Sequence, residues 1–262
     1  MSANTAPVVP RLAATILILR DTPQGMEVLM VVRHHEVDFM SGALVFPGGK
    51  LAKGDEEPRV RARCSGVENL SSEQLASRVG AIREAFEESG ILLARERGAT
   101  ALLGAARATQ LAERYGQQLD SGAIGIADLL EAEDLVLACE QLVSFARWIT
   151  PTFIPKRFDT YFYLAPAPAE QIAVHDGREM VEAQWIRPAD ALADQASGKR
   201  KIVMATLLNL RKLNRSSTVS AAIDAAFTRP IVTVLPELVE RPQGRTLLIP
   251  EAADYGLTEY PA

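Results

Sequence analysis

Hydrophobic residues along this chain fall into short strand-like runs and longer helical stretches. Two apolar runs rich in β-branched residues, 12–19 and 26–32, flank a turn-forming segment at 21–25, and this pattern predicts an N-terminal β-hairpin. The last apolar runs, 231–235 and 246–249, flank a turn that contains Pro and Gly, and they predict a C-terminal hairpin that either extends the main sheet or forms a dimer contact. Further strands are predicted at residues 44–46, 145–150, 157–164 and 183–186.

Helical patterns occupy much of the remaining sequence. We expect a helix over about residues 75–89, with Gly90 as its stop residue. Residues 99–135 have a largely helical pattern that is interrupted at 120–122. Residues 188–227 predict two or three helices with a broad apolar stripe that serves packing.

Three carboxylates lie on one side of the helix predicted at 75–89. At about 100° per residue, Glu84, Glu87 and Glu88 fall within an arc of roughly 100°. The opposite side carries the apolar residues Val79, Ile82 and Phe86. Glu84 and Glu88 repel each other at the i,i+4 spacing, so helix stability gives no reason for the arrangement. Such oxygen-rich clusters suit Mg²⁺ or Mn²⁺, although an acidic helix face is more often only solvated.

Upstream of this helix, a short apolar strand ends in a pair of glycines. The segment Leu44-Val45-Phe46-Pro47-Gly48-Gly49-Lys50 can turn tightly and bring its backbone close to a ligand. Together with Arg83-Glu84-Ala85-Phe86-Glu87-Glu88-Ser89-Gly90-Ile91, it resembles the signature of the Nudix hydrolase family. That signature is a Gly, five residues, a Glu, seven residues and then Arg-Glu-aliphatic-x-Glu-Glu-x-Gly-aliphatic. Gly49 stands at the opening glycine, and residues 83–91 match the closing half.

Two departures from the signature narrow the resemblance. Asp55 stands where the family has Glu, and 27 residues lie between Asp55 and Arg83 where the signature has seven. An insertion of about 20 residues, roughly 56–75, therefore splits the motif. We expect it to be a surface excursion that ends in a helix start, where Ser71 and Gln74 form a capping box. A split signature is similar to the Nudix branch that includes the peroxisomal coenzyme A diphosphatase.

The resemblance covers most of the chain and implies its fold. We expect an α/β (α+β) fold of the Nudix type, which is an α/β/α sandwich with a mixed central sheet, helical additions and a C-terminal hairpin. The expected organisation is a flexible N-terminus at residues 1–10 and a single Nudix hydrolase domain at 11–262. Within that domain lie the insertion at about 56–75 and a helical and hairpin extension at about 188–262.

The resemblance also implies metal-dependent hydrolysis of a phosphoanhydride, with Mg²⁺ (or Mn²⁺) as the cofactor. The reaction needs a metal to neutralise the diphosphate, a nucleophilic water, a group that takes its proton and positive charge for the departing phosphate. Glu87 and Glu88 are the expected metal ligands, and Glu84 is either a third ligand or the proton acceptor. Arg83 is expected to orient Glu87.

Other segments supply the remaining candidates. Many family members draw a further acidic metal ligand from a distant loop; Glu179 is the first choice for it here and Glu182 the second. Gly48 and Gly49 would bring the backbone close to the metal, and Asp55 is expected to play a supporting structural role. The candidates for binding substrate phosphate are Arg33, Lys156 and Arg157. Exposed basic residues are more often solvated than engaged in binding.

Coenzyme A or an acyl-coenzyme A is the expected substrate, with adenosine 3′,5′-bisphosphate and 4′-phosphopantetheine as products. This expectation rests on overall likeness to one branch of the family. ADP-ribose, NADH and dinucleoside polyphosphates share the same diphosphate chemistry and stay open as alternatives. A non-catalytic, nucleotide-sensing Nudix domain is an alternative of another class, but such domains often lose the carboxylates that are present here.

Bulk composition favours a single soluble enzyme domain. The chain has 262 residues and is 48% hydrophobic, and its net charge of −5 argues against nucleic acid or an anionic membrane surface as a partner. No apolar run approaches the roughly 18 residues that span a bilayer. Only Cys64 and Cys139 are present, so no disulfide framework is expected. We expect a small nucleotide-type substrate as the partner, a cytoplasmic location and no secretory signal, with a homodimer left open.

Overall fold

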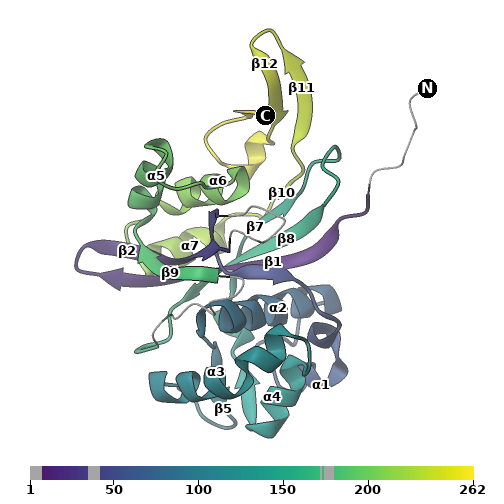
Figure 1. Cartoon of the computed structure of the whole chain (residues 1–262), viewed down its shortest axis with the longest axis vertical. Coiled ribbons are helices and arrows are strands. Elements are labelled where there is room, and N and C mark those ends of the chain that lie inside the picture. The colour runs from purple at the N-terminus through teal and green to yellow at the C-terminus, as the bar shows by residue number, and fades with distance from the viewer. Residues whose placement is uncertain (1–7, 35–41, 172, 174–179) are drawn as a thin grey trace.

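The chain folds into a mixed β-sheet with helices on both faces (Figure 1). The computed structural model describes residues 8–34, 42–171, 173 and 180–262. One group of helices lies below the sheet in the view of Figure 1 and another lies above it. This arrangement confirms the expected α/β/α sandwich with a mixed central sheet.

Eight strands of the described chain form the central sheet. They are β1 (Arg11–Thr22), β2 (Gly25–Arg33), β3 (Leu44–Val45), β4 (Gly48–Lys50), β7 (Val143–Ile149), β8 (Phe158–Pro166), β9 (Met180–Ile186) and β10 (Thr233–Val234). The strand order is β10-β7-β8-β1-β2-β3, with β4 paired to β1 and β9 paired to β2. The predicted N-terminal hairpin is confirmed, since β1 and β2 pair antiparallel. β1 also pairs parallel with β8, and this pairing makes the sheet mixed.

The sheet separates two hydrophobic cores, because successive side chains of a strand point to opposite faces. From β1, Ile16 and Ile18 enter one core, and Leu17 and Leu19 enter the other. The first core is covered by α1 (Pro58–Arg61), α2 (Ser72–Ser89), α3 (Ala105–Asp120), α4 (Ile126–Ala132) and the ribbon of β5 (Ala94–Glu96) and β6 (Leu135–Leu137). The second core is covered by α5 (Pro188–Ala196), α6 (Met204–Leu213) and α7 (Val219–Thr228).

Helix α2 carries the acidic motif and is capped at both ends. The Ser71 side chain accepts a hydrogen bond from the Gln74 N–H at 3.2 Å, and the Gln74 side chain accepts one from the Ser71 N–H at 3.0 Å. This confirms the predicted capping box and starts the helix at Ser72, three residues before the expected position. At the other end, Gly90 has a φ of 70° and donates to the Phe86 carbonyl, as expected for a glycine stop residue.

The inserted segment is anchored to the core, so the expectation of a surface excursion is wrong in part. A 3-10 helix, η1 (Lys53–Glu56), leads into α1, from which Val60 enters the first core together with Val67. Arg59 forms ion pairs with Asp128 at 2.8 Å and with Glu131 at 3.1 Å on α4. Because the segment is mostly polar, its sequence did not indicate that these two apolar residues would be buried. Their burial depends on α4 and β6 lying beside them.

The C-terminal hairpin is present, but its first strand lies later than predicted. The C-terminal strands after β10 are β11 (Glu237–Arg241), β12 (Gly244–Leu248) and β13 (Glu259–Pro261). β10, from the apolar run 231–235, pairs parallel with β7 at the edge of the central sheet. The hairpin joins β11 and β12, with β13 as the third strand of a separate sheet that projects from the body (Figure 1). Pro236 lies between β10 and β11 and separates them, because proline donates no ladder hydrogen bond.

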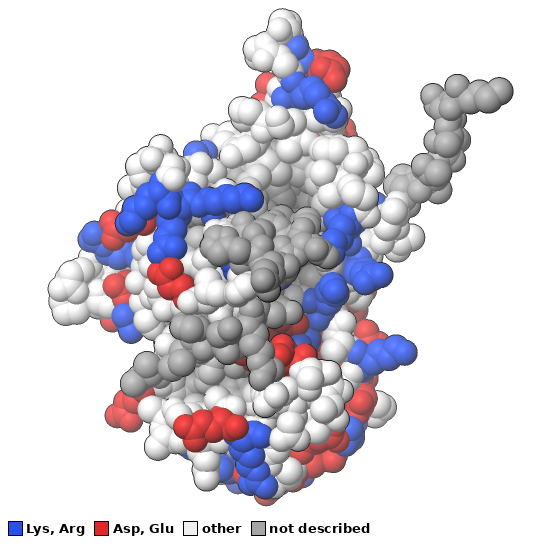
Figure 2. Space-filling model, viewed as in Figure 1, with Lys and Arg blue, Asp and Glu red and all other residues white. Residues whose placement is uncertain are grey.

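The face shown in Figure 2 carries acidic and basic side chains interspersed with neutral ones. Exposed pairs such as Arg187 with Asp190 contribute little to stability, because water screens both charges. Among the described residues, no helix combines the length and the apolar character needed to cross a lipid bilayer.

Candidate active site

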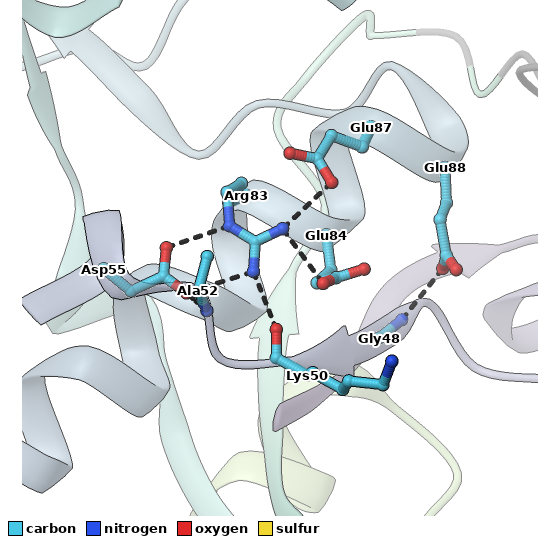
Figure 3. Close-up of polar contacts among 8 residues, drawn as sticks. All are labelled: Gly48, Lys50, Ala52, Asp55, Arg83, Glu84, Glu87 and Glu88. Carbon is cyan, nitrogen blue, oxygen red and sulfur yellow. Dashed lines mark hydrogen bonds and ion pairs between the residues drawn. The ribbon is translucent and has the colours of Figure 1, made fainter. Parts of the chain in front are cut away.

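The paired glycines of β4 bring its backbone against the acidic end of α2 (Figure 3). The Gly48 N–H donates a hydrogen bond of 2.9 Å to Oε2 of Glu88. A Cβ on Gly48 would lie 2.5 Å from the Ala14 carbonyl oxygen. A Cβ on Gly49 would lie 2.5 Å from Oε2 of Glu84. Glycine at position 48 is therefore needed for pairing with β1, and a side chain at position 49 would displace the Glu84 carboxylate.

Arg83 is the centre of the polar network, and all five of its N–H groups donate (Figure 3). Nε and one terminal nitrogen bind the two Asp55 oxygens at 2.9 and 3.0 Å. The other terminal nitrogen donates to Glu84 and to Glu87, each at 2.9 Å. The fifth N–H binds the Lys50 carbonyl oxygen at 2.9 Å. Burial alone would lower the pKa of Arg83, but the hydrogen bonds to Asp55 and the neighbouring carboxylates outweigh it and raise the pKa.

Asp55 stands where the motif ordinarily has Glu, and its side chain is almost completely buried. It is 1% exposed and also accepts a hydrogen bond of 2.8 Å from the Ala52 N–H. The carboxylate is thus held on one side by its own turn and on the other by Arg83, 28 positions later in the chain. Asp55 fixes the guanidinium, and the guanidinium in turn fixes Glu84 and Glu87.

The acidic face of α2 is not open to solvent as the sequence suggested. Glu88 is 3% exposed, and Glu84 and Glu87 are only partly accessible. β4 and Arg83 cover this side of the helix, a packing that helical periodicity does not report. The expected ion pair between Arg83 and Glu87 is present, but it is shared with Glu84.

The pKa of Glu87 is strongly shifted within this network. Burial raises the pKa of its carboxyl to about 7, with a smaller contribution from the charges of Glu84 and Asp55, and Arg83 opposes the shift. Oε2 accepts from Arg83, whereas Oε1 is buried and has no hydrogen-bond partner among the described residues. A buried oxygen in this condition needs a proton or a cation.

We expect Glu87 to make the stability of the metal-free protein depend on pH. Its ordinary pKa is 4.5 and its folded pKa is about 7, so between these values the folded chain binds more protons than the unfolded chain. The contribution of Glu87 is therefore fully present below about pH 4.5 and is lost as the pH rises through 7. Thermal melts across this range, with a chelator present, should show the loss in the wild type and not in Glu87→Gln. Parallel curves for the two proteins would contradict the assignment.

The donor set suits a hard divalent cation, although the carboxylates do not converge on one point in their present rotamers. Within residues 8–34, 42–171, 173 and 180–262, no three acidic, His or Cys side chains lie close enough together to hold an ion. The unpartnered Oε1 of Glu87 nevertheless fits a cation, and oxygen ligands are those that Mg²⁺ and Mn²⁺ take. Glu84, Glu87 and Glu88 are the residues that would hold the metal.

The structure places the other predicted site residues in different environments. Glu179 lies outside the described residues. Glu182, the second choice, is on β9, 41% exposed, and ion-paired with Arg200 at 2.7 Å. Arg33 ends β2, and its Nε is buried without a hydrogen-bond partner in the described part of the chain. Lys156 is exposed in the loop before β8.

Arg157 does not fit its expected role as a phosphate ligand. Its side chain is buried and donates to two backbone carbonyls, those of Thr150 at 2.9 Å and Val8 at 2.6 Å. These bonds fasten the chain entering β1 to the loop before β8. The charge is used for structure, because the guanidinium satisfies carbonyl groups that the strand edges leave open.

Sequence reasoning missed the part played by Lys50. Its carbonyl oxygen is a fixed partner of Arg83, and its side chain is exposed on β4 beside the carboxylates (Figure 3). The available signal was its position directly after the paired glycines, at the point where the backbone comes closest to α2.

Comparison with known proteins decides the family. Residues 62–213, more than half of the chain, match the NUDT19 Nudix domain. The chain belongs to the Nudix hydrolase family. The matched range of this Nudix protein includes all of α2 and begins after Gly49 and Asp55.

Individual relatives agree with the assignment. The Nudix chain is 28% identical over 207 residues to "Putative nudix hydrolase 7" of Caenorhabditis elegans, covering 78% of this chain and 61% of the relative. It is 24% identical over 211 residues to "Acyl-coenzyme A diphosphatase NUDT19" of Xenopus laevis, covering 66% of this chain and 56% of the relative. The chain thus spans about three fifths of the length of these curated relatives.

A solved structure shows the same fold. The crystal structure of a NUDIX hydrolase from Alicyclobacillus acidocaldarius has a TM-score of 0.72 and 28% sequence identity to this protein. The similarity covers 84% of this chain and 97% of that chain.

Proposed function

We propose that residues 11–262 act as one hydrolase domain that cleaves a phosphoanhydride in a nucleoside diphosphate linked to another group, with Mg²⁺ or Mn²⁺ as cofactor. The observation that carries this proposal is the Arg83 network. One buried guanidinium holds Glu84 and Glu87 beside β4, while Gly48 holds Glu88. A purely structural domain has no reason to gather three carboxylates against a glycine pair, because their mutual repulsion destabilises it.

The bound cation would neutralise the diphosphate and lower the pKa of a coordinated water. The protein's own residues have separate tasks. Glu87 and Glu88 would hold the cation, and Glu84 would either join them or take the proton from the attacking water. Arg83 acts through the carboxylates, since all of its N–H groups are engaged and none is left for substrate. Lys50, Arg33 and Lys156 are the candidates for binding phosphate oxygens.

Coenzyme A or an acyl-coenzyme A is the proposed substrate, which would give adenosine 3′,5′-bisphosphate and 4′-phosphopantetheine. Support comes from the split motif and from the match to the NUDT19 Nudix domain, whose Xenopus relative is named an acyl-coenzyme A diphosphatase. ADP-ribose, NADH and dinucleoside polyphosphates are the competing substrates, and nucleotide sensing without turnover is the competing function.

One experiment separates these functions. Purified protein would be incubated with Mg²⁺ and, in separate reactions, with coenzyme A, an acyl-coenzyme A, ADP-ribose, NADH and a diadenosine polyphosphate, and the products separated by chromatography. We expect the highest kcat/KM for coenzyme A or its acyl form. Faster cleavage of another member would reassign the substrate. Binding without cleavage of any member would establish a sensor and overturn the proposal.

Gly49→Ala is expected to reduce kcat/KM about 100-fold, because a misplacement of about 1 Å in a catalytic group has effects of that order. The new Cβ would lie 2.5 Å from the Glu84 carboxylate, which must move away. Thermal stability should change little, since only the end of a side chain is displaced. The matched control is Gly116→Ala on α3, where a Cβ meets open space. Equal activity of both variants would remove Glu84 from the site.

A further inference from the structure

The two cysteines of the chain come from segments that the sequence separates widely but the fold brings together. Cys64 lies in the inserted segment after α1, and Cys139 begins the 3-10 helix η2 (Cys139–Gln141) after β6. No others are present in the 262 residues. Both side chains belong to the first core, where Cys139 is buried and Cys64 packs against the cluster.

Backbone pairing fixes the two segments against each other. Cys64 forms a parallel β-bridge with Leu137, in which the Leu137 N–H donates to Arg63 at 2.8 Å and the Ser65 N–H donates to Leu137 at 3.0 Å. Farther along, a Cβ on Gly66 would lie 2.5 Å from the Cβ of Glu140. Residues 64–66 therefore follow residues 137–140 at about the 5 Å spacing of neighbouring strands. Cys139 stands two positions beyond the bridge partner of Cys64, where the chain enters η2, and the side chains of the two cysteines are near enough to hydrogen-bond, so their sulfur atoms lie within reach of each other.

The two thiols differ in accessibility. Cys64 is half-buried, so a small reagent can reach it, whereas Cys139 is fully buried. Interaction with the Cys64 thiol raises the pKa of Cys139 well above its ordinary value, and burial raises it further. Cys64 is thus the residue that meets a reagent first, and Cys139 is a slower partner that becomes more reactive as the pH rises.

We infer that Cys64 and Cys139 form a reversible disulfide by exchange with a low-molecular-weight disulfide, and that this bond ties the inserted segment to the core. In the first step the Cys64 thiolate attacks one sulfur of the reagent, forms a mixed disulfide and releases one thiolate. In the second step Cys139 loses its proton to the released thiolate and attacks the Cys64 sulfur. The second reagent thiolate then leaves and takes up a proton from water. The protein dithiol is oxidised by two electrons, and the reagent is reduced to two thiols.

The bond has a structural consequence independent of catalysis. It closes a long loop from the insertion through α2, α3, α4 and β6, which restricts the unfolded chain. For a protein of this size we expect the melting temperature to rise by roughly 10 °C on oxidation. The disulfide would thereby hold in place, through a covalent bond, the segment that joins Asp55 to α2.

The test uses the full chain, reduced, freed of reductant and incubated with glutathione disulfide. We expect denatured-state thiol titration to fall from two thiols per chain to none, and peptide mapping to link the Cys64 and Cys139 peptides within one chain. The melting temperature should rise and return on addition of dithiothreitol. Two retained thiols, glutathione left on both cysteines or a link between two chains would each overturn the inference.

Single variants separate the intramolecular bond from general oxidation. Cys139→Ser should keep one glutathione on Cys64 with no rise in melting temperature, and Cys64→Ser should leave Cys139 unmodified. If serine is not tolerated at the buried position, Cys139→Ala removes the thiol without introducing a hydroxyl. A melting-temperature rise of wild-type size in any of these variants would contradict the assignment.

Discussion

Replacing Glu88 with Gln is expected to lower kcat with Mg²⁺ by about 100-fold or more, since a catalytic cation supplies several kcal/mol and each tenfold in rate corresponds to about 1.4 kcal/mol. The substitution removes the charge that would hold the cation and keeps the size of the side chain. The amide oxygen of Gln can still accept the hydrogen bond from the Gly48 N–H, so β4 stays in place. The fold should therefore melt at nearly the wild-type temperature.

The measurement is initial hydrolysis rate against Mg²⁺ concentration, together with Mn²⁺ binding by electron paramagnetic resonance. Binding should weaken in Glu88→Gln even where turnover is too slow to follow. The control is Glu113→Gln on the exposed side of α3, which removes an identical charge far along the chain from the motif. Wild-type turnover with an ordinary Mg²⁺ dependence in Glu88→Gln would rule out Glu88 as a ligand.

Replacing Arg83 with Met is expected to reduce the free energy of unfolding by about 3–5 kcal/mol, because it leaves a buried carboxylate without its cation. Asp55 is 1% exposed and has both oxygens bound to Arg83, so water cannot replace the lost hydrogen bonds. For a chain of this length the melting temperature should fall by roughly 10 °C. Activity should fall as well, since Glu84 and Glu87 lose their common donor.

The matched control is Arg187→Met. Arg187 also binds both oxygens of an aspartate, Asp190, at 2.6 and 3.0 Å, but this pair is about half exposed. Its loss should change stability far less, because water screens both exposed charges. Combining Arg83→Met with Asp55→Asn should recover part of the lost stability, because the unpaired charge is then gone. Equal melting temperatures for Arg83→Met and Arg187→Met would show that the buried pair contributes no more to stability than the exposed pair.

Local patterns predicted most of the elements of this fold. The hairpin of β1 and β2, the capping box at Ser71 and the stop at Gly90 all depend on interactions between residues close in the chain. The helices at 99–135 and 188–227 follow from apolar periodicity in the same way. The C-terminal hairpin was misplaced because the run 231–235 found a partner in β7, more than 80 positions earlier.

The predicted positions of side chains agreed with the structure within one helix and were incomplete where they depended on contacts between segments. Periodicity placed Glu84, Glu87 and Glu88 together, and it also indicated the pair of Arg83 with Glu87. It could not show that the Arg157 side chain would donate its hydrogen bonds to the carbonyls of Val8 and Thr150. That outcome depends on which loops the sheet brings side by side.

The sequence by itself determined the family resemblance, the order of most strands and helices and the grouping of three carboxylates on one helix, because helical and strand periods are set by backbone geometry. The tertiary structure decided that these carboxylates are shielded, that Asp55 anchors Arg83 and that Cys64 lies beside β6. Each of these joins segments tens of residues apart. Burial and electrostatic partnership arise only when the sheet and its helices pack, and no local period encodes them.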